Sequence, residues 1–507
     1  MTNDEAGSRR LLARASLVAA GTLYQQGVAF ASGLIVARVI GAADYGVFAL
    51  ARSIVDLAGT VTRLGLDIGL QRFFGETSAP LNAVSRSVIL GRVRLLAVTA
   101  ALLAVATVGL WLGPYLETHV YRYRDFGAVL FCLAVMLPFA NDVAVLGGAY
   151  RGILDLTPSI VVECIVQPTV RLVAIGALML AGWRLWAVVV GTIFAACLAW
   201  LVLAAVSRDV FRDRVARLRA AWADAFHVVG YSSVLAVSVL VTSLTTSVDV
   251  LVLAHFADAA EIGRYSLVKT LLLIMGVLGV AFVQGLGTTV AALHYRGDRD
   301  GLRNAMAQTI TWIARTSLPA FLVFVFWGTE LMQVFGPTFQ SSATVVRWLA
   351  AGQFVFVVFG PCGWALSMTG RHVLELGVLV LGLAIAALAC WFAVPTFGQA
   401  GAAVAMAASA LATNALRVSV VARSFRALPF GAETLWLTAA GFALAWPVRA
   451  FVTSLDLPSP WGALLGSGTF LVCYAVAIWR FVLSAEERET VRGGVKRAQL
   501  RLSGARA

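Results

Sequence analysis

Long apolar runs, separated by short polar segments, recur along the whole chain. Most of them reach about 20 residues, which is the length that an α-helix needs to cross a bilayer. The short alternating strands of a transmembrane barrel are not evident in this pattern. We therefore predict an all-α polytopic membrane protein with about 14 transmembrane helices. Their approximate limits are 15–37, 46–66, 87–113, 126–148, 159–182, 185–206, 227–254, 263–290, 304–327, 345–368, 374–394, 401–421, 435–455 and 462–483.

Two short polar turns indicate that the chain consists of two related halves. The segment 38–52 reads RVIGAADYGVFALAR, and the segment 255–269 reads HFADAAEIGRYSLVK. A constant offset of 217 residues, from 44 to 261, aligns acid with acid, glycine with glycine, aromatic with aromatic and base with base. The aligned pairs are Asp44 and Glu261, Gly46 and Gly263, Phe48 and Tyr265, and Arg52 and Lys269. Since six spans precede the second half, we predict a parallel repeat of two six-helix lobes plus two extra C-terminal helices.

The repeat divides the chain into five predicted regions. The N-terminal lobe covers 1–206 and the C-terminal lobe covers 227–421. Between them, the segment 207–226 is rich in arginine and has apolar residues at helical spacing, so we predict a cytoplasmic amphipathic linker. The last two spans cover 422–483, and a polar, basic cytoplasmic tail covers 484–507.

Composition and charge support a membrane protein. Hydrophobic residues make up 60% of the 507 residues and charged residues 13%, whereas soluble proteins are about half apolar and a quarter charged. In a soluble protein the net charge of +13 would suggest nucleic acid as a partner. Here most arginines fall in alternate loops, as the positive-inside rule predicts for the cytoplasmic side. We therefore expect both termini in the cytoplasm and no nucleic-acid partner.

The sequence lacks common signatures of enzymes and metal sites. The motifs GxxxxGK[ST], HExxH and GxSxG are absent. The six cysteines fall in predicted spans and form no CxxC pair, so we expect small core residues and not disulfides or metal ligands. These observations predict a protein that is not an enzyme and that has no cofactor.

Ionisable side chains at membrane depth are costly, so each is a candidate for function. The deep charges are mostly cations, namely Arg52, Arg171, Lys269 and Arg315. Arg52 and Asp56 lie four residues apart on one helix face and can form a pair. Asp249 and Lys269 flank the second hairpin and can neutralise each other.

A cavity lined by such cations would attract an anion from the headgroup layer, because Coulomb attraction strengthens as water is excluded. Arginine presents a fork of donors that suits phosphate oxygens. A pump for cationic drugs would instead favour buried Asp and Glu. In the simplest alternative, every deep charge only pairs with a neighbouring helix. Arg417, near the cytoplasmic end of its span, is expected to be an anchor.

Three segments near the N-terminus carry a family resemblance. They read ARVIGAADYGVFAL at 37–50, LGLDIG at 64–69 and QRFF at 71–74. With its layout of six, six and two spans, the chain resembles, over nearly its whole length, the polysaccharide flippases of the multidrug/oligosaccharidyl-lipid/polysaccharide (MOP) exporter superfamily. It departs from the arginines that peptidoglycan-precursor flippases carry in the first span, because it has YQQ at 24–26.

The resemblance implies two six-helix lobes that form a V around a central cationic cavity. It implies as substrate an oligosaccharide on an undecaprenyl diphosphate carrier, which crosses from the cytoplasmic to the outer leaflet by alternating access. In family members, basic residues lining the lobes bind the diphosphate. We therefore expect this role for Arg52 and Lys269, at matching places in the two hairpins, and for Arg171 and Arg315.

The resulting hypothesis is a lipid-linked oligosaccharide flippase of the bacterial inner membrane, surrounded by membrane lipids. Asp56 and Asp249 would tune the cations or couple transport to an ion, H+ or Na+. One alternative is an antiporter of small cationic molecules on the same fold, which would bind its substrate with acidic residues. Another is a membrane polymerase or ligase of the same glycans, which would need essential residues in an external loop.

Overall fold

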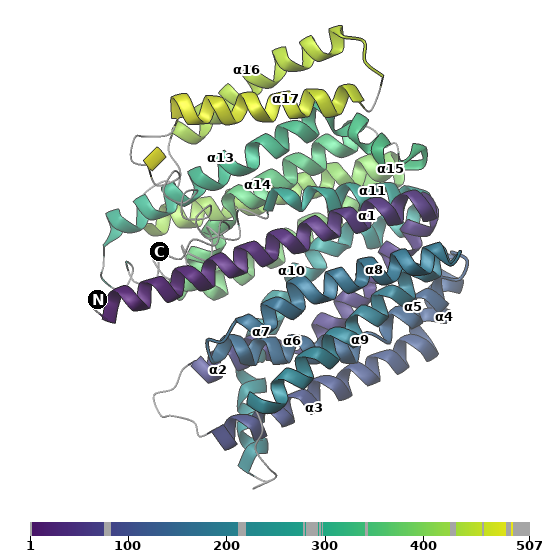
Figure 1. Cartoon of the computed structure of the whole chain (residues 1–507), viewed down its shortest axis with the longest axis vertical. Coiled ribbons are helices and arrows are strands. Elements are labelled where there is room, and N and C mark those ends of the chain that lie inside the picture. Colours follow the sequence, from purple (N-terminus) through teal and green to yellow (C-terminus); the bar gives the residue numbers. More distant parts are fainter. Residues whose placement is uncertain are drawn as a thin grey trace, which may run out of the picture.

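The structure is a computed structural model of the chain (Figure 1). It describes residues 3–75, 83–210, 220–276, 298–339, 343–425, 432–458 and 461–482, together with Gly279, Leu293, Arg296, Arg488 and Glu489. Every regular element within these residues is a helix. The predicted fold class, an all-α polytopic membrane protein, is therefore confirmed.

The first half of the chain forms helices α1 to α9. Their bounds are α1 Asn3–Arg63, α2 Leu66–Gly75, α3 Ala83–Thr107, α4 Gly113–Tyr115, α5 Phe126–Ala134, α6 Leu137–Gly152, α7 Thr157–Ile160, α8 Gln167–Leu180 and α9 Leu185–Val210. Three π-helical turns link some of them, namely η1 Val108–Leu112, η2 Leu116–Tyr121 and η3 Val161–Val166. The turn η3 comes just before Pro168, whose missing N–H prevents a regular helical hydrogen bond.

The second half of the chain forms the remaining helices. Their bounds are α10 Ala220–Phe256, α11 Ala259–Leu272, α13 Arg299–Leu331, α14 Ala343–Met368, α15 His372–Phe425, α16 Ala432–Ser454 and α17 Trp461–Ala477. Two short 3-10 turns, η4 Met332–Phe335 and η5 Pro337–Phe339, lie between α13 and α14, and a π-helical turn, η6 Ile478–Val482, follows α17.

Two of the long helices are bent at a glycine. In α1 the backbone leaves the helical region at Gly41, with φ 79° and ψ 175°, and in α15 it does so at Gly398, with φ 54° and ψ −135°. Positive φ favours glycine, because a side chain strains this conformation. In Figure 1 the N-terminus and α2 lie at the same end of the molecule, so the chain returns after crossing it once. Each bent helix therefore contains two of the predicted spans.

The helices agree with the predicted spans. Within the described residues, ten helical segments are long and apolar enough to cross a membrane, and Ala20–Arg63 and His372–Ser424 among them are the bent ones. Helices α11 and α16 coincide with the spans predicted at 263–290 and 435–455, although much of the former lies outside the described residues. The chain is thus a multi-pass membrane protein.

The helices pack in two groups. In the N-terminal group, α1 to α9, helices α2, α3 and α9 contact α6, and α8 contacts α9. In the C-terminal group, α10 to α17, helix α15 contacts α10 and α14, and α16 and α17 pack on α13. Between the groups, α1 contacts α10 and α11, and α2 and α3 contact α10. In Figure 1 helix α1 crosses the molecule between the two groups.

The predicted linker and tail are only partly described. Helix α9 extends to Val210 and α10 begins at Ala220, so both helices enter the segment 207–226, and the residues between them lie outside the described part of the chain. The predicted tail at 484–507 also lies outside it, apart from Arg488 and Glu489.

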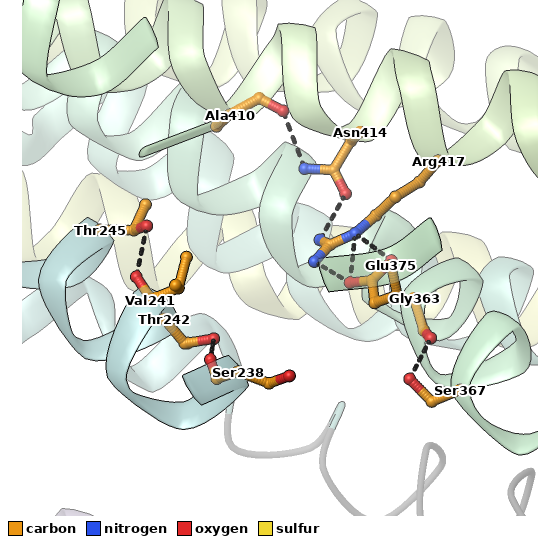
Figure 2. A network of polar contacts seen from close by, with 10 residues as sticks. All are labelled: Ser238, Val241, Thr242, Thr245, Gly363, Ser367, Glu375, Ala410, Asn414 and Arg417. Carbon is orange, nitrogen blue, oxygen red and sulfur yellow. Dashed lines mark hydrogen bonds and ion pairs between the residues drawn. The ribbon is translucent and has the colours of Figure 1, made fainter. Parts of the chain in front are cut away.

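A buried ion pair lies inside the C-terminal group (Figure 2). The guanidinium of Arg417 donates from Nε to Oε1 of Glu375 at 3.0 Å and from Nη1 to Asn414 at 3.4 Å. Arg417 is only 5% exposed. The expectation that it serves as an anchor is therefore wrong, because its helix turns the side chain into the group. Gly363 leaves room for the pair, since a Cβ there would lie 2.8 Å from Oε1 of Glu375.

Replacing Arg417 with Met is expected to lower the free energy of unfolding by about 3–5 kcal/mol, because Glu375 would remain as a buried charge without its counter-ion. Adding Glu375→Leu removes both charges and should recover most of the loss. Thermal unfolding of the purified protein in detergent measures both effects. A double variant no more stable than Arg417→Met would contradict this explanation.

Candidate functional site

The two hairpins predicted from the repeat touch each other directly. A Cβ added to Gly46 would lie 1.8 Å from the carbonyl oxygen of Ala259, and one added to Gly263 would lie 1.9 Å from that of Ala42. The repeat offset equates Gly46 with Gly263 and Ala42 with Ala259, so each half offers the same residues to the other. The contact is therefore reciprocal, like that of a two-fold symmetric dimer. It requires glycine, because only backbone atoms approach this closely.

Further contacts surround the two glycines. Arg38 donates from Nε to the carbonyl oxygen of Val334 at 2.8 Å, and the ring of Tyr45 meets that of Phe339 edge to face, with centroids 5.9 Å apart. In these contacts the segment between α13 and α14 reaches the first hairpin. We call all contacts between the two groups at this end of the helices the hairpin clamp.

The loop between η2 and α5 contributes to the hairpin clamp from the other side. The Tyr123 hydroxyl lies 2.7 Å from the carbonyl oxygen of Ala254 and 2.6 Å from that of Ala257, beside the second hairpin. Burial raises the pKa of Tyr123, and the nearby Asp258 raises it further, so the hydroxyl keeps the proton that it donates. Each group thus sends one loop to the hairpin of the other.

Arg52 lies in α1, six residues after Gly46. Its Nε donates to both carboxylate oxygens of Asp56, each at 2.9 Å, which confirms the predicted pairing. The side chains are 31% and 54% exposed, so the pair is open to exchange with another anion. Nη1 of Arg52 also approaches the sulfur of Met136 at 3.8 Å.

Arg171 of α8 lies near the Arg52–Asp56 pair. It interacts electrostatically with Arg52, Tyr45 and Asp56. Its Nε is buried and has no hydrogen-bond partner within the described residues. The structure thus brings two of the predicted site cations, from the second and fifth spans, within electrostatic range of each other and of Asp56. We call Arg52 and Arg171 the arginine pair.

Neutral polar groups lie on α8, the helix that carries Arg171, and on the first span in α1. The hydroxyl of Tyr24 hydrogen-bonds to that of Thr169 at 2.9 Å, and Gln25 donates to the carbonyl oxygen of Glu163 at 3.5 Å. Thr169 was not predicted from the sequence, because a single threonine in an apolar helix usually bonds to its own backbone. Thr169 does so here as well, donating to the carbonyl oxygen of Ile165 at 2.6 Å. Its position two residues before Arg171 was the available signal.

Lys269 is bound within its own half of the chain. Its Nζ donates to Oδ1 of Asp249 at 2.8 Å and to the carbonyl oxygen of Thr246 at 2.7 Å. Asp249 is fully buried and also accepts from the Tyr265 hydroxyl at 2.7 Å and from the Val250 amide at 2.8 Å. The predicted neutralisation of Lys269 by Asp249 is confirmed.

Arg315 lies on another face of the C-terminal group. Its guanidinium carbon lies 5.0 Å from the centre of the Trp312 ring. Its backbone carbonyl accepts from the Tyr474 hydroxyl of α17 at 3.1 Å, and its charge acts on the same hydroxyl. The structure therefore places Arg315 against α17, whereas Arg52 and Arg171 lie on helices of the N-terminal group.

Two further charged clusters in the N-terminal group were not predicted. Arg94 of α3 binds Asp142 of α6 in a bidentate pair. Arg151 lies 4.0 Å from Asp67 and 3.8 Å from Glu163. Ionisable residues at membrane depth were the signal in the sequence, but their partners are distant along the chain, so the pairs could not be assigned.

The fold is similar to that of known flippases and transporters. The structure matches that of the lipid II flippase MurJ in an inward closed conformation with a TM-score of 0.70 and 10% identity, covering 92% of this chain and 99% of that one. An inward-facing multidrug resistance MATE family transporter of the MOP superfamily matches with a TM-score of 0.62, 14% identity and coverage of 81% and 98%. The MATE multidrug transporter DinF-BH matches with a TM-score of 0.63, 14% identity and coverage of 82% and 95%.

At these identities the likeness establishes a shared fold. A search of curated protein sequences found no match. The model of a family described as polysaccharide biosynthesis protein matches residues 11–286, which is more than half of the chain. Together with its membrane-spanning helices and its MOP transporter fold, this match shows that the chain belongs to the polysaccharide biosynthesis protein family.

Proposed function

We propose that this protein is a flippase of the bacterial inner membrane. Its substrate is an oligosaccharide linked to undecaprenyl diphosphate, which it moves from the cytoplasmic to the outer leaflet for cell-surface polysaccharide synthesis. Family membership and the transporter fold support flippase or transporter activity in general. The observation that favours a diphosphate is the arginine pair, in which a buried guanidinium nitrogen of Arg171 lacks a partner within the described residues.

The charges of the site suit an anion. Two guanidinium groups interact electrostatically with one carboxylate, so the cluster carries a net positive charge when Asp56 is ionised. The diphosphate accepts from Arg171 and displaces Asp56 from Arg52, because a doubly charged group with several oxygens competes well with one exposed carboxylate. Asp56 is then free to take up H+ or Na+, which are our candidate coupling ions.

We assign different roles to the other two predicted cations. Lys269 lies at the position of the second hairpin that matches Arg52, but its charge is balanced by the buried Asp249. We therefore propose that it contributes a weaker, long-range attraction and that Asp249 tunes it. Arg315 lies against α17, so we leave it out of the diphosphate site.

Neutral groups on the first and fifth spans suit the glycan. The hydroxyls of Tyr24 and Thr169 lie on the first and fifth spans, and Thr169 is two residues from Arg171. Hydroxyl groups both donate and accept, as sugar hydroxyls do. We propose that these two side chains contact the first sugar while Arg171 holds the diphosphate.

In this proposal, the hairpin clamp closes and opens one face of the protein during transport. The distribution of basic residues supports an orientation with the hairpins at the outer face of the membrane. The clamp closes this face while the glycan enters from the cytoplasmic side. It then opens as the two groups rock apart, and the glycan leaves toward the outer leaflet.

The leaflet location of undecaprenyl-linked glycan, in cells depleted of the protein, tests this function. We expect the glycan to accumulate on the cytoplasmic side and wild-type protein to restore its translocation. Normal translocation with unpolymerised glycan outside would instead point to a polymerase or ligase.

Several structural neighbours are multidrug transporters, so export of cationic molecules is the second candidate function. It predicts greater drug sensitivity on depletion, with no change in the glycan. The positive net charge of the arginine pair and Asp56 opposes it, because this cluster would repel a cationic substrate.

A further inference from the structure

A charged pocket lies in the N-terminal group, apart from the arginine pair. Asp142 of α6 is 2% exposed and accepts three hydrogen bonds. Nε and Nη2 of Arg94 donate at 2.7 and 2.6 Å, and Nε1 of Trp200 donates at 2.7 Å. The helices α3, α6 and α9 supply one residue each, so the carboxylate is held rigidly and its charge is balanced.

A cavity with a volume of about 320 Å³ lies beside this pair. Apart from Arg94 and Asp142, its lining is mainly apolar and includes Gly91, Leu95, Val98, Phe139 and Trp200. Leu95 is 47% exposed, so the cavity opens to the surface of α3. In Figure 1, α3 forms the edge of the molecule farthest from α16 and α17. In a membrane this edge faces lipid.

The guanidinium of Arg94 is only partly used. Nε and Nη2 bind Asp142, whereas Nη1 has no partner within the described residues. The side chain is 31% exposed at the cavity. A donor at membrane depth cannot rely on bulk water, so it needs an acceptor from protein, lipid or ordered water. A lipid that enters the cavity can supply one.

Depth and charge indicate which lipid group fits. Arg94 lies six residues, or about 9 Å, inside the apolar segment that begins at Val88. Arg86 and Arg92 precede it in the same helix, so this end of α3 is basic. Basic pockets between helices on the cytoplasmic side attract anionic headgroups.

We propose that this cavity is a binding site for an anionic phospholipid of the surrounding bilayer. The lipid phosphate accepts from Nη1 of Arg94, and the first part of an acyl chain lies over Leu95, Val98 and Phe139. The proposal requires the cytoplasmic orientation of this end of α3 but not the identity of the transported substrate. The bound lipid would fasten α3 and α9 to the bilayer while the two groups move.

Gly91→Leu provides a specific test of the cavity. A Cβ on Gly91 would meet no atom within 4 Å, so leucine can fill the cavity and leave the Arg94–Asp142 pair intact. Gly377→Leu in α15 is the matched control, because a Cβ there also meets nothing within 4 Å. The full-length protein, purified in detergent, is titrated with phosphatidylglycerol or phosphatidylcholine, and native mass spectrometry counts the bound lipids.

We expect wild type and Gly377→Leu to prefer phosphatidylglycerol and Gly91→Leu to bind it at least 10-fold more weakly. Arg94→Lys retains the charge but loses the fork, and it should reduce the preference in the same direction. Equal binding of both phospholipids by wild type, or unchanged binding by Gly91→Leu, would overturn the proposal. Stronger competition by undecaprenyl phosphate than by phosphatidylglycerol would also overturn it, by assigning the cavity to the transported lipid.

Discussion

Replacing Arg171 with Gln is expected to abolish most glycan translocation without destabilising the protein. Loss of a charge-assisted contact to phosphate costs about 1.5–3 kcal/mol, which weakens substrate binding roughly 10- to 150-fold. Stability should hold or rise, because the substitution removes a guanidinium that repels Arg52 and whose buried Nε lacks a partner within the described residues. Polymer export in cells and thermal unfolding in detergent measure the two effects.

Two controls separate a binding role from a structural one. Arg52→Gln should also impair translocation, since it removes the other half of the arginine pair. Arg347→Gln should have little effect on export, because Arg347 donates to the backbone carbonyl of Val325 in the C-terminal group, on other helices. If Arg171→Gln exported polymer normally, the diphosphate would have to bind elsewhere. If it lost export only because it unfolded, the position of Arg171 would be structural.

Replacing Gly46 or Gly263 with Leu is expected to block translocation by preventing closure of the hairpin clamp. A Cβ at either position would meet backbone atoms at less than 2 Å, and a backbone cannot rotate away as a side chain can. The two helices must then separate. Because the contact is reciprocal, the two substitutions should be similarly severe. This symmetry distinguishes the clamp from an ordinary packing defect in one helix.

Crosslinking measures the state of the hairpin clamp. Arg38→Cys and Val334→Cys place thiols where α1 meets the segment between α13 and α14. A short bifunctional reagent should link them in an otherwise wild-type protein and much less after Gly46→Leu. Gly33→Leu is the matched control in α1, because a Cβ there meets nothing within 4 Å. Equal crosslinking in all three proteins would contradict the proposed clamp.

The membrane-spanning helices and the two matching hairpins could be predicted from the sequence by itself. The thickness of the bilayer sets the length of each apolar run, and the backbone must satisfy its hydrogen bonds as a helix there, so local composition is sufficient. The two hairpins were visible because polar turn residues interrupt apolar runs at matching places. The pairing of Arg52 with Asp56 followed from helical spacing, since residues four apart share one face. Proximity to the second hairpin likewise suggested the pair of Asp249 and Lys269.

Only the tertiary structure decided which deep charges meet. A nearly uniform apolar helix does not reveal its rotation, because neighbouring helices and not hydrophobicity set which face points inward. Arg171 therefore could not be placed beside Arg52, nor Arg315 against α17, from sequence. Arg417 lies near the predicted cytoplasmic end of its span, as an anchoring residue would. However, Glu375, 42 residues away, holds its side chain inside the C-terminal group. The sequence determines that such cations lie in the membrane, whereas helix packing determines whether each one is neutralised or left able to bind an anion.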